Sequence, residues 1–204
     1  AAAGTETSMS DFQTSDALRR GRLFVVSAPS GAGKTTLCRG LREHFGDIAY
    51  SVSFTTRTPR EGERDGIDYH FISVAEFRQG VETGRWAEWA EVYGNYYGTS
   101  AAALERTLSA GKDLLLEIDV QGCAQIVERF PEAVTVFIMP PSFDVLRERL
   151  AKRGQDDPAV IERRLRAARR EMDQAHGYRH VIVNDHLETA QAELIAVVQA
   201  ARER

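Results

Sequence analysis

Apolar positions along the chain form short continuous runs, separated by segments with helical periodicity. The first run, residues 23–26, is of the kind that is buried on both faces of a parallel sheet. Similar runs cover residues 114–119, 133–139 and 181–183. Because strands alternate with helices, the pattern predicts an α/β fold with a mostly parallel sheet that carries helices on both faces. The helices are expected over residues 35–45, 99–110, 142–154, 158–176 and 188–202.

The stretch that follows the first helix departs from this alternation. Two short β-like pieces, residues 50–55 and 69–72, are separated by a polar turn. A helix follows them, since Ser73 and Glu76 have the spacing of a capping box. We therefore expect an inserted unit of mixed α/β structure rather than another strand–helix repeat.

The composition, 43% hydrophobic and 27% charged over 204 residues, predicts one soluble globular domain. Residues 1–20 are expected to lie outside it, as a tag remnant before Met9 and a short extension. No apolar segment is long enough to span a membrane, and no signal peptide is recognisable. The net charge of −4 argues against a general affinity for nucleic acid or anionic membranes. Cys38 and Cys123 have no metal-ligand spacing, which favours a reduced, cytoplasmic location.

A glycine-rich loop connects the first strand to the first helix, with the sequence Ala-Pro-Ser-Gly-Ala-Gly-Lys-Thr over residues 28–35. Such a loop can turn its N–H groups inward around phosphate oxygens, and the helix amino end adds a partial positive charge. Lys34 should reach the β- and γ-phosphates of ATP, and the Thr35 hydroxyl should bind Mg²⁺. Ala28 replaces the first glycine of the usual pattern. The predicted phosphate site comprises Ala28, Pro29, Ser30, Gly31, Ala32, Gly33, Lys34, Thr35 and Thr36.

Two acidic residues, Glu117 and Asp119, close the apolar strand over residues 114–119. In a nucleotide-binding sheet an acid at this position often lies near the metal. It can equally be a turn or cap residue, so both possibilities stay open. Given the phosphate loop, we expect Glu117 to act on Mg²⁺ through water and Asp119 to face the acceptor site.

The inserted unit carries residues that could bind a phosphoryl acceptor. Arg57 and Arg60 stand three apart beside hydroxyl side chains, in a stretch that Pro59 keeps from being helical. An arginine fork binds a phosphate dianion through two parallel hydrogen bonds, which lysine cannot match. Further candidates are Tyr69, Glu88 and the run Asn-Tyr-Tyr-Gly-Thr over residues 95–99.

In this order and at this spacing, these motifs resemble those of the guanylate kinase family. The resemblance extends from about Arg22 to the C-terminus and is carried by residues 51–66, 95–98 and 181–185 together with the phosphate loop. It implies a P-loop nucleoside monophosphate kinase fold. The implied division of residues 21–204 is a core (21–50, 100–145 and 172–204), a GMP-binding subdomain (51–99) and a mobile lid (146–171).

The resemblance also assigns roles within the acceptor site. Two arginines and two tyrosines would hold the GMP phosphate, and the remaining residues would read the guanine. Thr99 stands where the family commonly has serine, which preserves the hydroxyl. The implied phosphate ligands are Arg57, Arg60, Tyr69 and Tyr97, and the implied guanine ligands are Ser53, Glu88, Thr99 and Asp119.

The chemistry of guanine supports the assignment of Glu88 independently. Guanine presents N1–H and N2–H₂ as neighbouring donors, which one carboxylate can accept together, whereas adenine presents an acceptor at N1. Adenine would leave the carboxylate unpaired, at a cost of ~1–3 kcal/mol. Taken singly, Glu88 could be a solvated surface acid, and Tyr69 and Tyr97 could be core aromatics. Their joint occurrence in family order favours the site.

Residues 147–170 carry nine basic and four acidic side chains, in a chain whose net charge is negative. Basic helix faces are commonly only solvated, and Arg166, Arg169 and Arg170 could be no more than that. The resemblance implies that this segment, interrupted at residues 154–158, closes over ATP with its arginines on the phosphates. It implies ATP contacts by Arg149, Arg153 and Asn184, the last at the adenine, and catalytic roles for Lys34, Arg57, Arg153 and Arg164.

The sequence thus predicts a cytoplasmic enzyme that transfers the γ-phosphate of ATP to GMP, and by resemblance to dGMP, with Mg²⁺ as cofactor. No nucleic-acid or membrane partner is expected, and the oligomeric state is left open. A general base is not required, because the attacking group is an anionic phosphate oxygen. The alternatives are a non-catalytic binding module of guanylate-kinase type and a kinase for another nucleoside monophosphate. Lys34 and Thr35 argue against the first, and Glu88 with the arginine pair against the second.

Overall fold

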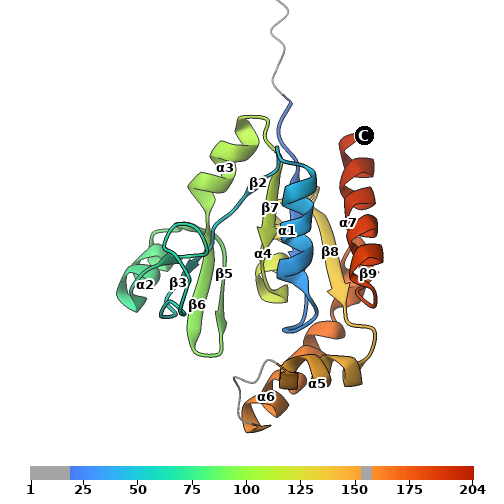
Figure 1. Ribbon diagram of the computed structural model, residues 1–204. Helices are drawn as coiled ribbons and strands as arrows, with labels where there is room; N and C mark the ends of the chain where they lie inside the picture. Colours follow the sequence, from blue (N-terminus) through green and yellow to red (C-terminus); the bar gives the residue numbers. More distant parts are fainter. Residues whose placement is uncertain (1–18, 153–157) are drawn as a thin grey trace, which may run out of the picture.

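The computed structural model describes residues 19–152 and 158–204 and is built around a parallel sheet (Figure 1). The strands of this sheet are β1 (Leu23–Ser27), β2 (Ala49–Tyr50), β7 (Leu114–Glu117), β8 (Val134–Met139) and β9 (His180–Val183). Their order is β2-β7-β1-β8-β9, and every neighbouring pair is parallel. All residues of the central strand β1 are buried, which agrees with its uninterrupted apolar sequence. The predicted α/β fold with a parallel sheet is confirmed.

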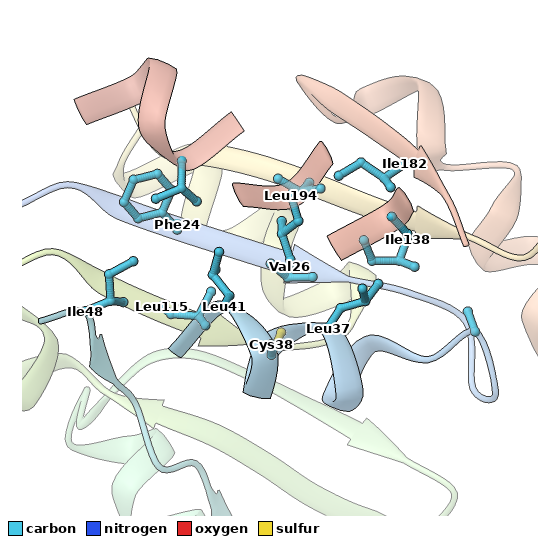
Figure 2. Packing of buried hydrophobic residues seen from close by; sticks show 14 residues of the cluster. Phe24, Val26, Leu37, Cys38, Leu41, Ile48, Leu115, Ile138, Ile182 and Leu194 are labelled. Carbon is cyan, nitrogen blue, oxygen red and sulfur yellow. The ribbon is translucent and has the colours of Figure 1, made fainter. Parts of the chain in front are cut away.

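One face of the sheet is covered by α1 (Lys34–His44) and α7 (Leu187–Arg202). Side chains alternate along β1, and Phe24 and Val26 point to this face. Figure 2 shows them packed with Leu194 of α7 and with apolar residues of α1. This packing fixes α1, and with it the loop that precedes α1, against the carboxyl end of β1.

The opposite face is covered by α3 (Ala101–Ser109) and α4 (Val120–Arg129). Leu23 and Val25 of β1 belong to the apolar cluster on this side, together with Ile126 of α4. The sheet is therefore covered on both faces, as the continuous apolar strands predict.

The inserted segment forms a second, mixed sheet that lies beside the first (Figure 1). Its order is β4-β3-β6-β5, and α2 (Val74–Glu82) packs on it through Phe77, which stacks on Trp86. The expected capping box of α2 is present, since Ser73 and Glu76 each accept a hydrogen bond from the other's backbone N–H. The strands are β3 (Phe54–Thr55), β4 (His70–Phe71), β5 (Trp86–Val92) and β6 (Asn95–Ser100).

The predicted helix over residues 99–110 is wrong at its start, because Thr99 and Ser100 belong to β6. β5 and β6 form a hairpin whose turn residues, Tyr93 and Gly94, have φ of 51° and 81°. Positive φ at both positions is the geometry of a type I′ turn, which matches the twist of paired strands. Helix α3 begins only at Ala101, after Ser100 has capped it.

Two further helices, α5 (Phe143–Lys152) and α6 (Pro158–Met172), pack on each other through their own apolar cluster. They lie beyond the carboxyl end of β8 (Figure 1). The Arg163 guanidinium of α6 is 5.3 Å from the ring centroid of Tyr93, so α6 contacts the tip of the hairpin. Nearly all of residues 1–20 and of the interruption at 154–158 lies outside the described residues. Within the described part of the chain, no helix is both long and apolar enough to cross a membrane.

Candidate active site

The loop between β1 and α1 has the geometry of an anion-binding cradle. Gly31 and Gly33 adopt left-handed φ angles of 93° and 96°, which other residues avoid. Gly33 is the N-cap of α1, where no side chain caps the helix and no acidic residue stands in the first turn. The helix amino end is therefore left without a competing acceptor, as anion binding requires. Asn184 supports the loop from behind, because its Nδ2 donates to the Ala32 carbonyl over 2.7 Å.

The first turn of α1 meets the carboxyl end of β7. Lys34 Nζ donates to the Ile118 carbonyl over 3.0 Å, and Thr35 Oγ1 donates to Glu117 Oε1 over 2.5 Å. The Tyr50 hydroxyl donates to Glu117 Oε2 over 3.3 Å, and burial raises the pKa of Tyr50, so it remains a donor. This contact holds the Glu117 carboxylate beside the phosphate loop.

A hydroxyl and a carboxylate are hard oxygen ligands, which suit Mg²⁺ when phosphates and waters complete its coordination. Thr35 and Glu117 supply this pair. Among the described residues, no three or more His, Cys, Asp and Glu side chains form a group that could hold a metal. Thr35 and Glu117 therefore fit a metal ion whose remaining ligands would be phosphates and waters.

A cavity of about 320 Å³ opens in front of the loop. Its walls come from the loop and α1, the end of β7, the second sheet and α6, which are far apart in the sequence. It brings together most of the residues predicted for phosphate, metal and acceptor binding. These are Ala28, Pro29, Ser30, Gly31, Gly33, Lys34, Thr35, Thr36, Ser53, Arg60, Tyr69, Glu88, Tyr97, Glu117, Asp119 and Arg164.

Some predicted site residues lie one layer behind the cavity wall. Ala32 is fully buried under the loop, and Asn184, 5% exposed, is held against it. Arg149 Nη2 donates to the backbone carbonyl of Asn184 over 3.1 Å, which ties α5 to the same support. Thr99 likewise stands behind Glu88, and Arg57, which pairs with Glu63, does not line the cavity. The prediction for Arg153 lies outside the described residues.

Glu88 is the buried acid of the acceptor side, with only 3% of its surface exposed. It lies on β5 opposite Thr99 of β6, whose hydroxyl donates to Oε1 over 2.6 Å. Burial raises the pKa of Glu88 to about 7; the hydrogen bond from Thr99 opposes this, and the charge of Asp119 adds to it. A carboxylate so poorly solvated gains strongly from a ligand that offers it N–H donors.

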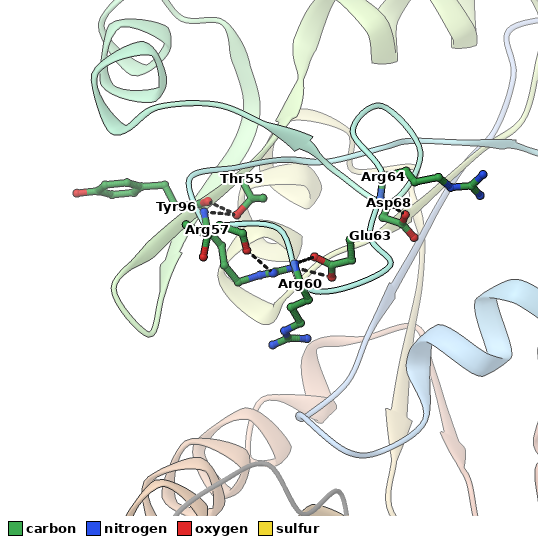
Figure 3. A network of polar contacts seen from close by, with 8 residues as sticks. Thr55, Arg57, Arg60, Glu63, Arg64, Asp68 and Tyr96 are labelled. Carbon is green, nitrogen blue, oxygen red and sulfur yellow. Dashed lines mark hydrogen bonds and ion pairs between the residues drawn. The ribbon is translucent and has the colours of Figure 1, made fainter.

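Glu63 organises the arginine-bearing loop (Figure 3). Arg57 Nη2 donates to Glu63 Oε1 over 2.8 Å, and the Arg60 backbone N–H donates to Oε2 over 2.7 Å. The ion pair lowers the pKa of Glu63 and raises that of Arg57, so both are charged. The Arg60 guanidinium points away from these contacts in Figure 3 and lines the cavity. Glu63 therefore fixes the loop and leaves one guanidinium for a ligand.

Two tyrosines connect this loop to the cavity. The rings of Tyr69 and Tyr97 meet edge to face at 6.0 Å, and the Arg57 guanidinium lies 5.3 Å from the Tyr69 ring centroid. Burial raises the pKa of Tyr69, so its hydroxyl is a donor at neutral pH. Arg60 and the two hydroxyls thus offer donors to an anion from one side of the cavity.

Asp119 is the N-cap of α4 and also lines the cavity. Its Oδ1 accepts from the Gly122 N–H over 2.8 Å, which makes it the N-cap of α4. Its Oδ2 accepts from Gln121 Nε2 over 3.0 Å, and the side chain lines the cavity. The cap holds the carboxylate in place without removing it from the site.

Two polar residues of the cavity, Tyr93 and Glu171, are not predicted from the sequence. Tyr93 stands at the tip of the hairpin, 5.9 Å from the Arg164 guanidinium, and its neighbour Gly94 is the signal that could have placed it in a turn. Glu171 lies in the last turn of α6, and its pKa is raised mainly by burial and further by the charge of Asp119. No local signal distinguishes Glu171, because only the docking of α6 brings it to the cavity.

Comparisons with known proteins identify one family. A family model described as Guanylate kinase matches residues 20–201. The guanylate kinase of Chromohalobacter salexigens is 52% identical over 185 residues, which are 91% of this chain and 86% of that protein. The guanylate kinase of Geobacter sulfurreducens is 50% identical over 182 residues, 89% of this chain and 90% of that protein.

A solved structure gives the same result. The crystal structure of guanylate kinase from Anaplasma phagocytophilum is similar with a TM-score of 0.74 and 33% sequence identity. The similarity covers 91% of this chain and 88% of that one. Sequence and structure therefore agree over both sheets and the helices beyond them, and the chain belongs to the guanylate kinase family.

Proposed function

We propose that the chain catalyses the reaction of its family, transfer of the γ-phosphate of ATP to GMP, and that it also accepts dGMP. The observation that carries the proposal is that one cavity joins the phosphate loop to a buried carboxylate and an exposed arginine. Lys34 marks the donor side, and Glu88 and Arg60 mark the acceptor side. These are the groups that a triphosphate, a guanine and a monophosphate need.

On the donor side, the loop N–H groups and Lys34 would hold the β- and γ-phosphates. Thr35 would hold Mg²⁺ directly and Glu117 through water. When bound there, Mg²⁺ would neutralise charge on the phosphates and on the transferring group. Asn184, which supports the loop, would border the adenine from behind.

On the acceptor side, Glu88 would accept both N1–H and N2–H₂ of guanine. Thr99 keeps the Glu88 carboxylate in place, and Ser53 and Asp119 would bind the remaining base edge. The GMP phosphate would lie at the opposite end of the site, held by Arg57, Arg60, Tyr69 and Tyr97. Arg57 would reach the phosphate by leaving Glu63, to which it is bound here.

The helices α5 and α6 would act as the lid, over residues 146–171, between a core and a GMP-binding subdomain over residues 51–99. Arg164 already lines the cavity from α6, and Arg149 and Arg153 belong to the same unit. Closure would bring arginines to the transferring phosphoryl and exclude water, which limits hydrolysis of ATP.

The chemistry then needs alignment and charge neutralisation rather than a base, because the attacking GMP oxygen is already anionic. Lys34 and the lid arginines would stabilise the donor phosphates, and Arg57 and Arg60 would overcome repulsion between two anions. We also place the enzyme in the cytoplasm, where its buried free thiols, Cys38 and Cys123, stay reduced.

The test is ADP formation from Mg-ATP with GMP, dGMP, AMP, CMP and UMP in parallel. We expect strong activity with GMP, weaker activity with dGMP and little with the others. Faster turnover with another monophosphate would contradict the guanine assignment. GMP binding without ADP formation would instead indicate a non-catalytic binding module.

Replacing Arg60 with alanine should raise the KM for GMP by roughly 10- to 100-fold, because a charge-assisted contact to a phosphate is lost. The KM for ATP should change little, since Arg60, which lines the cavity, is proposed to bind the acceptor phosphate. Steady-state kinetics with each substrate varied in turn provides the measurement. Arg64→Ala is the matched control, an exposed arginine of the same loop outside the cavity. An unchanged affinity of Arg60→Ala for GMP would remove Arg60 from the phosphate site.

A further inference from the structure

Gly122 stands in the first turn of α4, where glycine is an unfavourable choice. Glycine destabilises a helix relative to alanine. Its φ at this position is not in the left-handed region, so the backbone does not require it. The requirement comes from space: a Cβ atom at Gly122 would lie 2.2 Å from Oε2 and 3.0 Å from Cδ of Glu88.

The carboxylate that this Cβ would meet is confined from the other side as well. Glu88 is 3% exposed, and Thr99 donates to its Oε1 over 2.6 Å. The same Cβ would also lie 3.4 Å from Oδ1 of Asp119, so a methyl group would stand between two carboxylates of the acceptor site. Gly122 itself donates its N–H to Asp119.

The clash would be relieved by the side chain rather than by the helix. Oε2 is the end of a flexible side chain, whereas the first turn of α4 is fixed by its cap and by packing of Ile126 in the core. A methyl group at residue 122 would therefore displace the Glu88 carboxylate and leave the fold in place.

We infer that Gly122 is a positioning residue that sets the place of the guanine-reading carboxylate and so determines acceptor specificity without touching the substrate. The inference rests on the proposed role of Glu88. The glycine leaves a space that the carboxylate fills, and Thr99 and Gly122 together hold it at one position on the cavity wall.

The test is Gly122→Ala, compared with the wild-type enzyme in steady-state kinetics. We expect the KM for GMP to rise roughly 10- to 100-fold, since the carboxylate no longer meets both guanine donors. The KM for ATP should stay within about twofold and Tm should be unchanged or higher, because alanine favours the helix. Gly177→Ala is the matched control: apart from Gly177 and its chain neighbours, no atom lies within 4 Å of a Cβ there, and its φ is not left-handed.

A double-mutant cycle with Glu88→Ala separates this role from a general effect on α4. Without the Glu88 carboxylate the methyl group has room, so Gly122→Ala should add less than about twofold to the KM for GMP. If Gly122→Ala alone folds poorly, the double variant should still fold as well as Glu88→Ala.

Three outcomes would overturn the inference: an unchanged KM for GMP in Gly122→Ala, a full effect that persists without Glu88, or a double variant less stable than Glu88→Ala. A wild-type protein that does not phosphorylate GMP would instead refute the proposed function. The two failures are therefore distinguished by the wild-type rate.

Discussion

Replacement of Lys34 by alanine should lower kcat for GMP phosphorylation by roughly 1,000-fold, with a much smaller change in the KM for GMP. The Nζ group is fixed 3.0 Å from the Ile118 carbonyl, where the phosphate loop meets the end of β7. A cation held there would face the phosphates whose charge is redistributed in the transition state, and one such preorganised contact is worth ~3–4 kcal/mol. Coupled measurement of ADP formation at saturating ATP and GMP gives kcat directly.

Lys112→Ala is the control for removing a lysine. This lysine is exposed and precedes β7, at the opposite end of the sheet from the phosphate loop. Its replacement should leave kcat within about twofold. Calorimetric titration should show that Lys34→Ala still binds GMP, because most of the proposed acceptor contacts come from the inserted segment that forms the second sheet. A loss of less than tenfold in kcat would contradict the assignment of Lys34 to the transferring phosphate.

The central sheet and the phosphate loop could be predicted because their signals are local. The apolar run that forms β1 predicts a strand buried on both faces. The glycines at positions 31 and 33 indicate a turn in left-handed conformation. The helix that follows needs only its apolar periodicity. Fold class follows from these elements, since parallel strands joined by helices leave few arrangements.

The second sheet was harder to predict, because its strands depend on distant partners. β3 and β4 have two residues each; they pair with each other, and β3 also pairs with β6. In β5 a charged residue, Glu88, occupies a buried position, so the polar pattern does not show which face is inside. Its burial is a property of the site, and local sequence rules fail where function places a charge in the interior.

Helix α4 was missed because its amino end serves the cavity. Asp119 closes the preceding strand in the sequence pattern, yet in the structure β7 ends at Glu117 and Asp119 caps the helix. Gly122 then weakens the helical signal in the first turn. Asp119 and Gly122, which obscure the helix in the sequence, both lie beside the Glu88 carboxylate. The charge of Asp119 helps to raise the pKa of Glu88, and a Cβ atom at Gly122 would clash with the carboxylate.

Most of the candidate site was predicted through family resemblance, and the geometry divides it into layers. Lys34, Arg60 and Glu88 line the cavity, whereas Thr99 supports Glu88 and Asn184 supports the phosphate loop from behind. Sequence spacing cannot make this distinction, since it does not orient side chains. Glu171, conversely, lines the cavity but could not be predicted from the sequence, because this acid in a basic helix reaches the cavity only through the packing of α6.

Glu88→Gln should lower kcat/KM for GMP by roughly 100-fold and leave the low activity with AMP nearly unchanged. Glutamine keeps the shape of the side chain, but its NH₂ group faces the guanine donors where the carboxylate would accept. The ratio of kcat/KM for GMP to kcat/KM for AMP should therefore fall by the same factor. Glu91→Gln, an exposed acid on the same strand, is the matched control and should behave as wild type. An unchanged ratio of GMP to AMP activity in Glu88→Gln would exclude Glu88 from guanine recognition.

The pH dependence of the wild type and of Glu88→Gln provides a second test of the role of Glu88 in binding GMP. Burial raises the pKa of Glu88 to about 7, so the carboxylate is ionised above that pH and protonated below it. If guanine donates to the ionised form, as proposed, the KM for GMP in the wild type should rise as pH falls from 8 to 6. The GMP phosphate also titrates near pH ~6, but it does so with both proteins. The KM of Glu88→Gln relative to wild type should therefore shrink as pH falls. A ratio of KM values that stays constant from pH 8 to 6 would show that the ionisation of Glu88 has no part in binding GMP.

The stability of the two proteins should respond to pH in the opposite direction. Folding raises the pKa of the buried Glu88, so its ionisation destabilises the native state as pH rises towards about 7. Glu88→Gln should therefore be the more stable protein at pH 8, and this advantage should vanish at pH ~4.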